Sequence, residues 1–386
     1  MIRDPEQLQA LVDGVDRFVR DRLLPAEAIV EETDEIPADI IQDMRELGLF
    51  GLSVPEEFGG LGLTTEEEAH VIIALSWASP AYRSLIGTTV GIGSQGIVID
   101  GTPEQKAEFL PQLASGEKIA SFCLTEPDSG SDAGSLRTRA VRDGDHYIVN
   151  GTKRFITNAP QAGLFTLMAR TDPNEKGAAG VSAFVVDADS PGIRFGRKDA
   201  KMGMRGAHTC DVIFEDVRVP ADRIVGGVEG QGFKTAMKVL DKGRIHIGMI
   251  CVGAAHRILD EALRYATERR QFGQPIANFQ LVQAMLADSR AELYAARCMV
   301  MDAARRRDAG ERISTEAAAT KLFCSEMAGR VADRALQILG GAGYTKEYVI
   351  ERFYRDVRLF RIYEGTSQIQ QLVIARNMIK DGPRVL

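Results

Sequence analysis

The spacing of hydrophobic residues divides the chain into a helical, a β and a second helical region. Up to about residue 118, apolar residues recur every three or four positions, as they do on one face of a helix. Between 119 and 230 the repeat shortens to every second residue, which is typical of strands. From 231 to the end the helical spacing returns in longer segments. The pattern predicts a mainly α protein with an inserted β domain, divided into residues 1–118, 119–230 and 231–386.

Turn and cap residues refine the prediction inside these regions. Asn150-Gly151 stands between two apolar runs and predicts a two-residue β-hairpin turn. Further strands are expected over 165–170, 181–186 and 212–219. In the flanking regions, helices are expected over 84–100, 103–113, 232–268, 278–309 (with Asn278 as N-cap) and 346–355, and after Gly365, where Thr366 or Ser367 would be the cap. Their length and wide apolar surface predict a helical bundle that also packs against other subunits.

The composition is that of an ordinary globular protein of 386 residues, with 45% hydrophobic and 26% charged residues. A net charge of −7 argues against a nucleic-acid partner, and no apolar run reaches the roughly 18 residues that a membrane span requires. The five cysteines are scattered and form no C-x-x-C pair, which disfavours a metal site or a disulfide framework and fits a cytoplasmic location.

The candidate for chemistry is Glu364, which lies between Tyr363 and the run Gly365-Thr366-Ser367. A carboxylate in a short loop at a helix entrance, flanked by apolar residues, is well placed to act as a base with a raised pKa. On the spacing alone, it is equally an acid in a first helical turn that the helix dipole favours. No G-x-G-x-x-G follows a first strand, and neither a P-loop nor a Ser-His-Asp pattern is present to suggest another chemistry.

Six motifs occur in an order that resembles the acyl-CoA dehydrogenase family over nearly the whole chain. They are LTEP (124–127) with GSD (130–132), GTKRFITN (151–158), KMGMRG (201–206), FEDVRVP (214–220), ERRQFG (268–273) and IYEGTS (362–367). The resemblance implies an N-terminal helical domain, a middle β domain and a C-terminal four-helix bundle, assembled as a homotetramer.

The resemblance also implies an FAD-dependent reaction on an acyl-CoA substrate. Glu364 would remove the α-proton of the thioester, and a hydride would pass from the β-carbon to flavin N5, giving a trans-2-enoyl-CoA. An electron-transferring flavoprotein would be the electron acceptor.

Site residues carry over from the matching motif positions. The flavin contacts within one subunit would be Phe122, Leu124, Thr125, Ser131, Phe155 and Thr157, with Thr366 and Gln368 beside the FAD. Contacts to a neighbouring subunit's FAD would be Arg269, Gln271, Phe272, Gln280, Gln337 and Gly341. The substrate contacts would be Ser131, Asp241, Arg244, Tyr363 and Gly365.

Two positions bear on the choice within the family. Gly243 stands where isovaleryl- and long-chain-type relatives place their base, and its lack of a side chain favours Glu364. Tyr82-Arg83-Ser84 resembles the segment of glutaryl-CoA dehydrogenases whose Arg binds the distal carboxylate of the substrate. Arg83 is equally a surface or helix-pairing residue on sequence alone. A decarboxylating glutaryl-CoA-type enzyme, an oxidase-like or monooxygenase-like relative and a non-catalytic flavoprotein therefore remain the alternatives.

Overall fold

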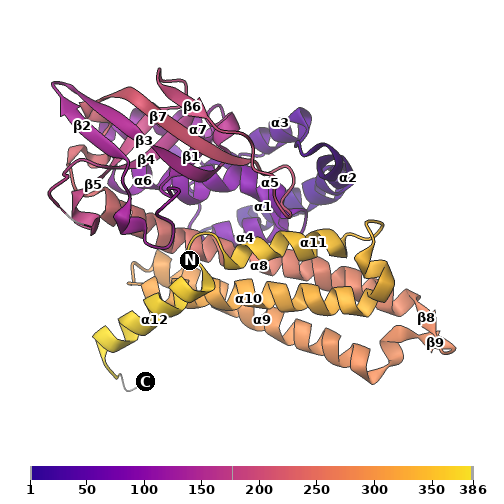
Figure 1. Ribbon diagram of the computed structural model, residues 1–386. Helices are drawn as coiled ribbons and strands as arrows, with labels where there is room; N and C mark the ends of the chain where they lie inside the picture. The colour runs from indigo at the N-terminus through magenta and orange to yellow at the C-terminus, as the bar shows by residue number, and fades with distance from the viewer. Residues whose placement is uncertain (1, 176, 384–386) are drawn as a thin grey trace.

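The computed structural model describes residues 2–175 and 177–383. The middle part of the chain forms a β domain that lies beside the N-terminal helices and against one end of the C-terminal bundle (Figure 1). The mainly α fold with an inserted β domain is therefore confirmed.

The N-terminal domain consists of helices with short connections. Its α-helices are α1 Pro5–Phe18, α2 Leu24–Thr33, α3 Ala38–Glu46, α4 Thr65–Leu75, α5 Pro80–Gly87, α6 Gln95–Asp100 and α7 Pro103–Ala114. Thr64 begins α4 with a capping box, in which its hydroxyl accepts from the Glu67 amide at 3.2 Å and the Glu67 carboxylate accepts from the Thr64 amide at 2.9 Å. The single helix expected over 84–100 is wrong, because the π-helical segment Thr88–Gly93 separates α5 from α6.

The β domain is one twisted sheet. Its strands are β1 Ala120–Cys123, β2 Arg139–Asp143, β3 His146–Thr157, β4 Leu164–Arg170, β5 Val181–Asp187, β6 Ile193–Phe195 and β7 Thr209–Pro220. Among the described residues the strand order is β1-β4-β2-β3-β7-β6, with β5 added on β4.

The predicted hairpin turn at Asn150-Gly151 is wrong. Both residues lie inside β3, where the register with β7 shifts between Val149 and Gly151, and β2 turns into β3 earlier, between Asp143 and His146. A long strand that pairs on both sides accommodates the Asn-Gly pair as a bulge instead of a turn.

The C-terminal domain begins with α8 Gly232–Glu268, the longest described helix. It continues through the short strands β8 Arg270–Gln271 and β9 Gln274–Pro275, then α9 Gln280–Asp308, α10 Ser314–Leu339, α11 Ile350–Val357 and α12 Ser367–Asp381. Phe279, not Asn278, is the N-cap of α9, because Asn278 still belongs to a preceding 3-10 turn. Thr366 caps α12 as expected, its hydroxyl accepting from the Ile369 amide at 3.2 Å.

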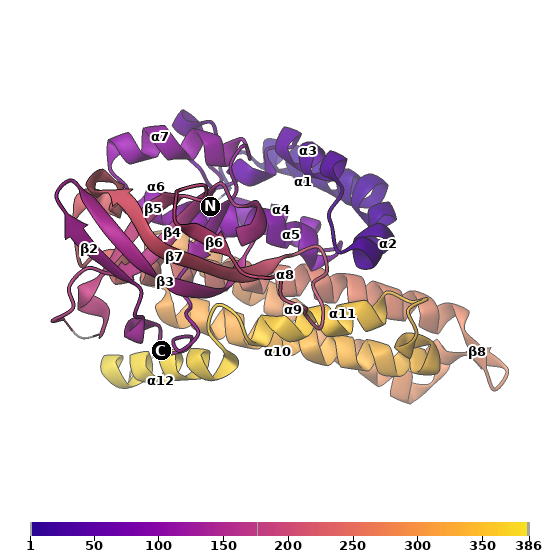
Figure 2. The ribbon, with the colours of Figure 1, turned by 45° about the horizontal axis from the view of Figure 1, so that its top comes forward.

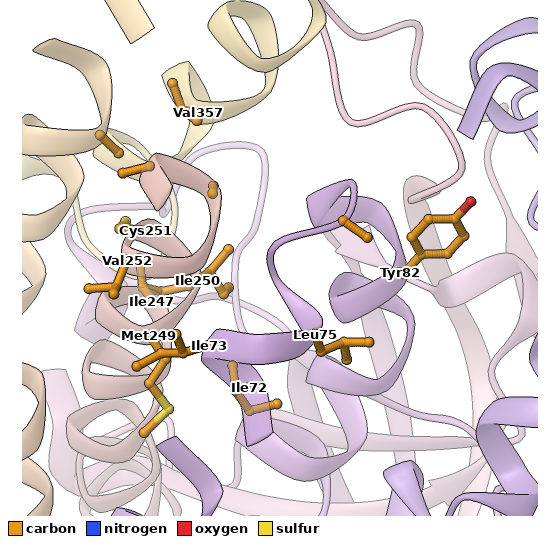
Figure 3. Packing of buried hydrophobic residues seen from close by; sticks show 14 of the residues in the cluster. Ile72, Ile73, Leu75, Tyr82, Ile247, Met249, Ile250, Cys251, Val252 and Val357 are labelled. Carbon is orange, nitrogen blue, oxygen red and sulfur yellow. The ribbon is translucent and has the colours of Figure 1, made fainter. Parts of the chain in front are cut away.

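Helix α8 holds the three parts together. Its middle packs Ile247, Ile250 and neighbouring residues against Ile72 and Ile73 of α4 (Figure 3). Its first residue touches the β domain so closely that a Cβ at Gly232 would lie 2.2 Å from the Ala183 amide nitrogen. Helix α12 lies at the end of the bundle nearest to the β domain (Figure 2). None of the described helices is long and apolar enough to cross a membrane.

Candidate active site

A cavity of about 510 Å³ opens where the three domains meet. A volume of this size is ordinary for a small-molecule site. The N-terminal domain contributes Arg83, Ser84, Gly87, Thr88 and Ile92. The β domain contributes Phe122, Leu124, Thr125, Gly130, Ser131, Asp132, Ala133, Gly134, Phe155, Ile156, Thr157 and Ala178. The C-terminal domain contributes Phe233, Met237, Leu240, Arg244, Tyr363, Glu364, Gly365, Ile369, Leu372, Val373 and Arg376.

Glu364 stands in the loop that enters α12, in a backbone conformation that side chains rarely adopt. Its φ is 50°, in the left-handed region, which is strained for a residue other than glycine. The loop is held from two sides: Gln370 Nε2 donates to the carbonyls of Glu364 and Gly365 at 3.1 and 3.0 Å, and Lys321 Nζ donates to the Gly365 carbonyl at 2.7 Å. These bonds fix the direction in which the carboxylate points.

One oxygen of the Glu364 carboxylate is out of water and lacks a local partner. This Oε2 atom is buried and has no hydrogen-bond partner among the described residues. Burial raises the pKa of Glu364, while the nearby cations Arg83, Lys321 and Arg244 act in the opposite direction. A desolvated carboxylate with a raised pKa has the properties of a general base for proton abstraction.

Gly243 of α8 is the residue that leaves room for this carboxylate. A Cβ at position 243 would lie 2.1 Å from Glu364 Oε2 and 3.2 Å from its Cδ. No side chain fits there while Glu364 keeps its position. The structure therefore explains in steric terms why a glycine accompanies a base at 364.

An aromatic wall faces the cavity from β3. Phe155 has a φ of 57° next to the register shift between Lys153 and Ile156, and its side chain is 58% exposed. Thr157 follows on the same side of the cavity. An exposed ring beside a hydroxyl offers a flat apolar surface with one polar contact, which suits a planar heterocyclic ligand.

A buried ion pair joins the LTEP segment (124–127) to the strand that carries GTKRFITN (151–158). Lys153 Nζ of β3 lies 2.8 Å from Glu126 Oε1 and donates to the Leu124 carbonyl at 3.1 Å. The second carboxylate oxygen of Glu126 accepts from the Arg137 amide at 2.6 Å. This pair fixes the loop that carries Thr125 and Ser131 against the strand that carries Phe155, and sequence patterns gave no sign of it.

The structure brings only part of the predicted site together within one chain. Of the residues predicted from the sequence, those that line the cavity are Phe122, Leu124, Thr125, Ser131, Phe155, Thr157, Arg244, Tyr363, Glu364 and Gly365. Asp241 lies beside them and accepts from Arg244 Nη1 at 2.6 Å. Thr366 and Gln368 occupy the start of α12 outside the cavity lining.

The remaining predicted residues lie at the opposite end of the bundle. Arg269, Gln271 and Phe272 surround the β8–β9 turn, and Phe272 is 93% exposed (Figure 1). Gln280 begins α9 there, and Gln337 and Gly341 mark the end of α10. Tyr265 and Tyr348, with ring centroids 5.5 Å apart, join the end of α8 to the chain that follows α10. In one chain these residues form a second group, separate from the cavity.

Several lining residues carried no sequence signal. Thr88 and Ile92 belong to the π-helical segment, and Leu372, Val373 and Arg376 belong to α12. The α12 residues reach the cavity because of how α12 packs beside the β domain, which local sequence patterns do not determine.

Comparisons with known proteins agree with this architecture. Residues 5–117, 121–217 and 230–379 match, in order, the N-terminal, middle and C-terminal domains of acyl-CoA dehydrogenase. The chain belongs to the acyl-CoA dehydrogenase family and is an oxidoreductase of that family.

Relatives in this family carry names for reactions in both directions. The Bacillus subtilis protein named Probable acyl-CoA dehydrogenase YngJ is 43% identical over 375 residues, covering 97% of this chain and 98% of that protein. The Caffeyl-CoA reductase-Etf complex subunit CarC of Acetobacterium woodii is 42% identical over 358 residues, covering 91% and 92%. The structure of butyryl-CoA dehydrogenase from Megasphaera elsdenii superimposes with a TM-score of 0.94 at 33% identity, covering 98% of this chain and 100% of that one.

Proposed function

We propose that the protein is an FAD-dependent acyl-CoA dehydrogenase that converts an acyl-CoA thioester to the trans-2-enoyl-CoA, with Glu364 as the base. The observation that carries the proposal is the unpartnered, buried Oε2 of Glu364 in a cavity with an aromatic wall. A base without an internal partner is free to take a proton from a ligand in the same cavity.

The cavity residues fit a flavin. Phe155 offers the flat surface, Thr157 and Thr125 offer hydroxyls, and Ser131 lies in the loop that the Glu126–Lys153 pair anchors. Bound FAD supplies the two-electron acceptor of the reaction. The chain itself holds the acyl group, keeps water away from Glu364 and takes the α-proton on the carboxylate. Arg83, Lys321 and Arg244 stabilise the ionised form of that carboxylate, so the base remains usable despite its burial.

We further propose that a homotetramer completes the FAD site and that an electron-transferring flavoprotein takes the electrons. The group around Phe272 lies away from the cavity, so it contributes to an FAD site only through a second copy of the chain. A relative that is a subunit of a reductase-Etf complex supports the choice of electron partner.

A glutaryl-CoA-type activity is the second candidate. Arg83 is not a surface residue: it is 5% exposed and lines the same cavity as Glu364, although it also contacts His246 of helix α8. A guanidinium in that place suits an acyl group that ends in a carboxylate.

The test is an anaerobic visible spectrum of the FAD-loaded protein, titrated with acyl-CoAs of several chain lengths and with glutaryl-CoA. Loss of the oxidised-flavin band with a set of thioesters is the expected result, and the set ranks the substrates. Faster bleaching by glutaryl-CoA than by butyryl-CoA would favour the second candidate. Flavin that stays oxidised with every thioester would contradict the dehydrogenase and point to a non-catalytic flavoprotein.

A further inference from the structure

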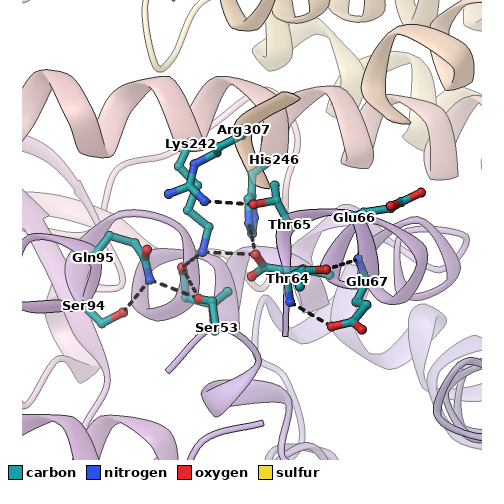
Figure 4. Close-up of polar contacts among 12 residues, drawn as sticks. Ser53, Thr64, Thr65, Glu66, Glu67, Ser94, Gln95, Lys242, His246 and Arg307 are labelled. Atoms are coloured by element: carbon teal, nitrogen blue, oxygen red, sulfur yellow. Dashed lines mark hydrogen bonds and ion pairs between the residues drawn. The ribbon is translucent and has the colours of Figure 1, made fainter. Parts of the chain in front are cut away.

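A buried chain of polar side chains runs from α4 through α8 to Arg83. Glu68 of α4 and His246 of α8 are both 0% exposed, and His246 Nε2 lies 3.1 Å from Glu68 Oε2. On its other side, His246 Nδ1 lies 2.7 Å from Arg83 Nη2. Lys242 Nζ also lies 3.1 Å from Glu68 Oε2. Lys242 and His246 both point towards the first turns of α4 (Figure 4).

The direction of these contacts follows from what each group can donate. A guanidinium only donates, so His246 Nδ1 must be the acceptor and the ring proton must sit on Nε2, facing Glu68. Burial lowers the pKa of His246 to about 4, although the Glu68 charge opposes the shift. The imidazole is therefore neutral near pH 7, and that form is the one that can accept from Arg83.

The charges in this chain are also balanced. Glu68 Oε2 lies 3.1 Å from the Lys242 ammonium, and this charge, together with the Nε2–H of His246, lowers the pKa of the Glu68 carboxylate in spite of its burial. Because the Lys242 ammonium pairs with the Glu68 carboxylate, Arg83 is not needed to neutralise the charge of Glu68.

Gly87 of α5 leaves room for the Arg83 guanidinium, whereas Gly91 of the π-helical segment is not required for it. A Cβ at Gly87 would lie 2.4 Å from Arg83 Nη1. A Cβ at Gly91 would lie 3.5 Å from Arg83 Nη2 and 3.7 Å from His246 Nδ1, in ordinary contact. Any larger residue at position 87 would therefore occupy space that the Arg83 guanidinium needs.

Arg83 still has donors to offer. Among the described residues its only hydrogen bond runs from Nη2 to His246, so Nη1 has no acceptor in the protein. The side chain lines the cavity that contains Glu364. A nearly buried guanidinium with an unpartnered N–H requires an acceptor, and a ligand in the cavity is the group that can bring one.

We propose that His246, anchored by Glu68, is a positioning residue that holds Arg83 in the acyl cavity, so that Arg83 binds a carboxylate at the far end of the acyl group. This inference rests on the proposed function and specifies its substrate class. Arg83 is the group that touches the substrate, and His246 acts through it.

The test measures binding without turnover. The parent is the FAD-loaded Glu364→Gln variant, and calorimetry gives the Kd values of glutaryl-CoA and butyryl-CoA. We expect glutaryl-CoA to bind more tightly, and His246→Leu in this background to reduce that preference about tenfold, because the Arg83 guanidinium loses its acceptor. His246→Asn, whose amide oxygen can replace Nδ1 as acceptor, should retain most of the preference. His256→Leu removes a half-exposed histidine further along α8 and is the matched control.

Each outcome decides the inference. A parent that does not prefer glutaryl-CoA overturns it, and so does a preference that His246→Leu leaves unchanged. A loss in His246→Leu that His246→Asn does not restore assigns His246 a merely structural role and also overturns it. The dehydrogenase reaction itself is decided separately, by bleaching of the wild-type flavin with any thioester.

Discussion

At the scale of single residues, the site depends on one carboxylate whose surroundings pull its pKa in two directions. Burial favours the protonated form of Glu364, and three cations favour the ionised form. The net direction is upward, which increases the strength of the Glu364 carboxylate as a base. The surroundings therefore predict both how activity responds to loss of the carboxylate and how it responds to loss of a cation.

Glu364→Gln should keep the shape of the site and lose its base. We expect the rate of flavin reduction by the preferred acyl-CoA to fall by about a thousandfold or more. FAD content and acyl-CoA affinity should stay near the wild-type values, because the amide occupies the same volume. Stopped-flow reduction and calorimetric binding check the two parts, and near-normal reduction in this variant would show that another group is the base.

Lys321→Met should change the pH profile of the reaction. The base must be ionised, so kcat/KM falls as the pH drops through the pKa of Glu364. Lys321 lowers that pKa, so its removal should move the acid limb of the profile to higher pH. The control is Lys321→Arg, which keeps the charge.

Profiles of kcat/KM against pH for the three proteins, recorded between about pH 5 and 8, provide the measurement. An acid limb that stays in place in Lys321→Met would mean that this lysine acts only by holding the Gly365 carbonyl.

At the scale of elements, helix α8 sets the geometry of the site. Within two turns it carries Arg244 towards the cavity, Gly243 against Glu364, and Lys242 and His246 towards α4. These residues face three directions because a helix advances about 100° per residue, and each direction has a different partner. A substitution at Gly243, Lys242 or His246 therefore changes the site although none of these residues lines the cavity.

Gly243→Ala should disable the base through contact alone. The new Cβ would lie 2.1 Å from Glu364 Oε2, so the carboxylate or the helix must move. We expect a large loss of flavin reduction and a destabilisation of about 1–3 kcal/mol. Gly96→Ala is the matched control, because its Cβ meets its nearest neighbour at 3.6 Å. Urea unfolding and stopped-flow reduction of both variants test this, and unchanged reduction in Gly243→Ala would mean that Glu364 has room elsewhere.

The sequence predicted elements well where one local signal decides the structure, and failed where pairing or packing decides it. Thr366 caps α12 as expected, since a cap needs only its own first turn. Asn150-Gly151 became a bulge because β7 continues to pair with β3 beyond it. Glu68 and His246 went unnoticed as partners, because no spacing rule joins residues from helices so distant in the chain.

At the scale of the whole molecule, the predicted FAD residues separate into two groups at opposite ends of the bundle. The cavity group around Phe155 lies within one chain, where the three domains meet. The group around Phe272 is exposed and does not contribute to the lining of that cavity. Domain order was predictable from periodicity, but this separation follows from the direction of α8, which only the packed bundle reveals.

An exposed aromatic residue at a turn points to a partner surface. Phe272 is 93% exposed, has a φ of 50°, and packs edge-on against Phe279 at 5.9 Å between ring centroids. Exposing an aromatic ring to water costs free energy in a free monomer. At an interface the same ring can be buried, and aromatic residues there contribute much of the binding energy.

Phe272→Ser should therefore weaken both assembly and FAD retention. If a second copy covers this turn and shares its FAD, the variant loses tetramer and cofactor together, whereas the fold of each chain is kept because Phe272 lies outside the core. Sedimentation velocity reports the assembly, and the ratio of flavin to protein absorbance reports the cofactor. Val141→Ser, which removes an exposed apolar side chain from β2, is the control. A Phe272→Ser tetramer with full FAD occupancy would contradict the shared site. A monomer that keeps its FAD would show that assembly and cofactor binding are independent.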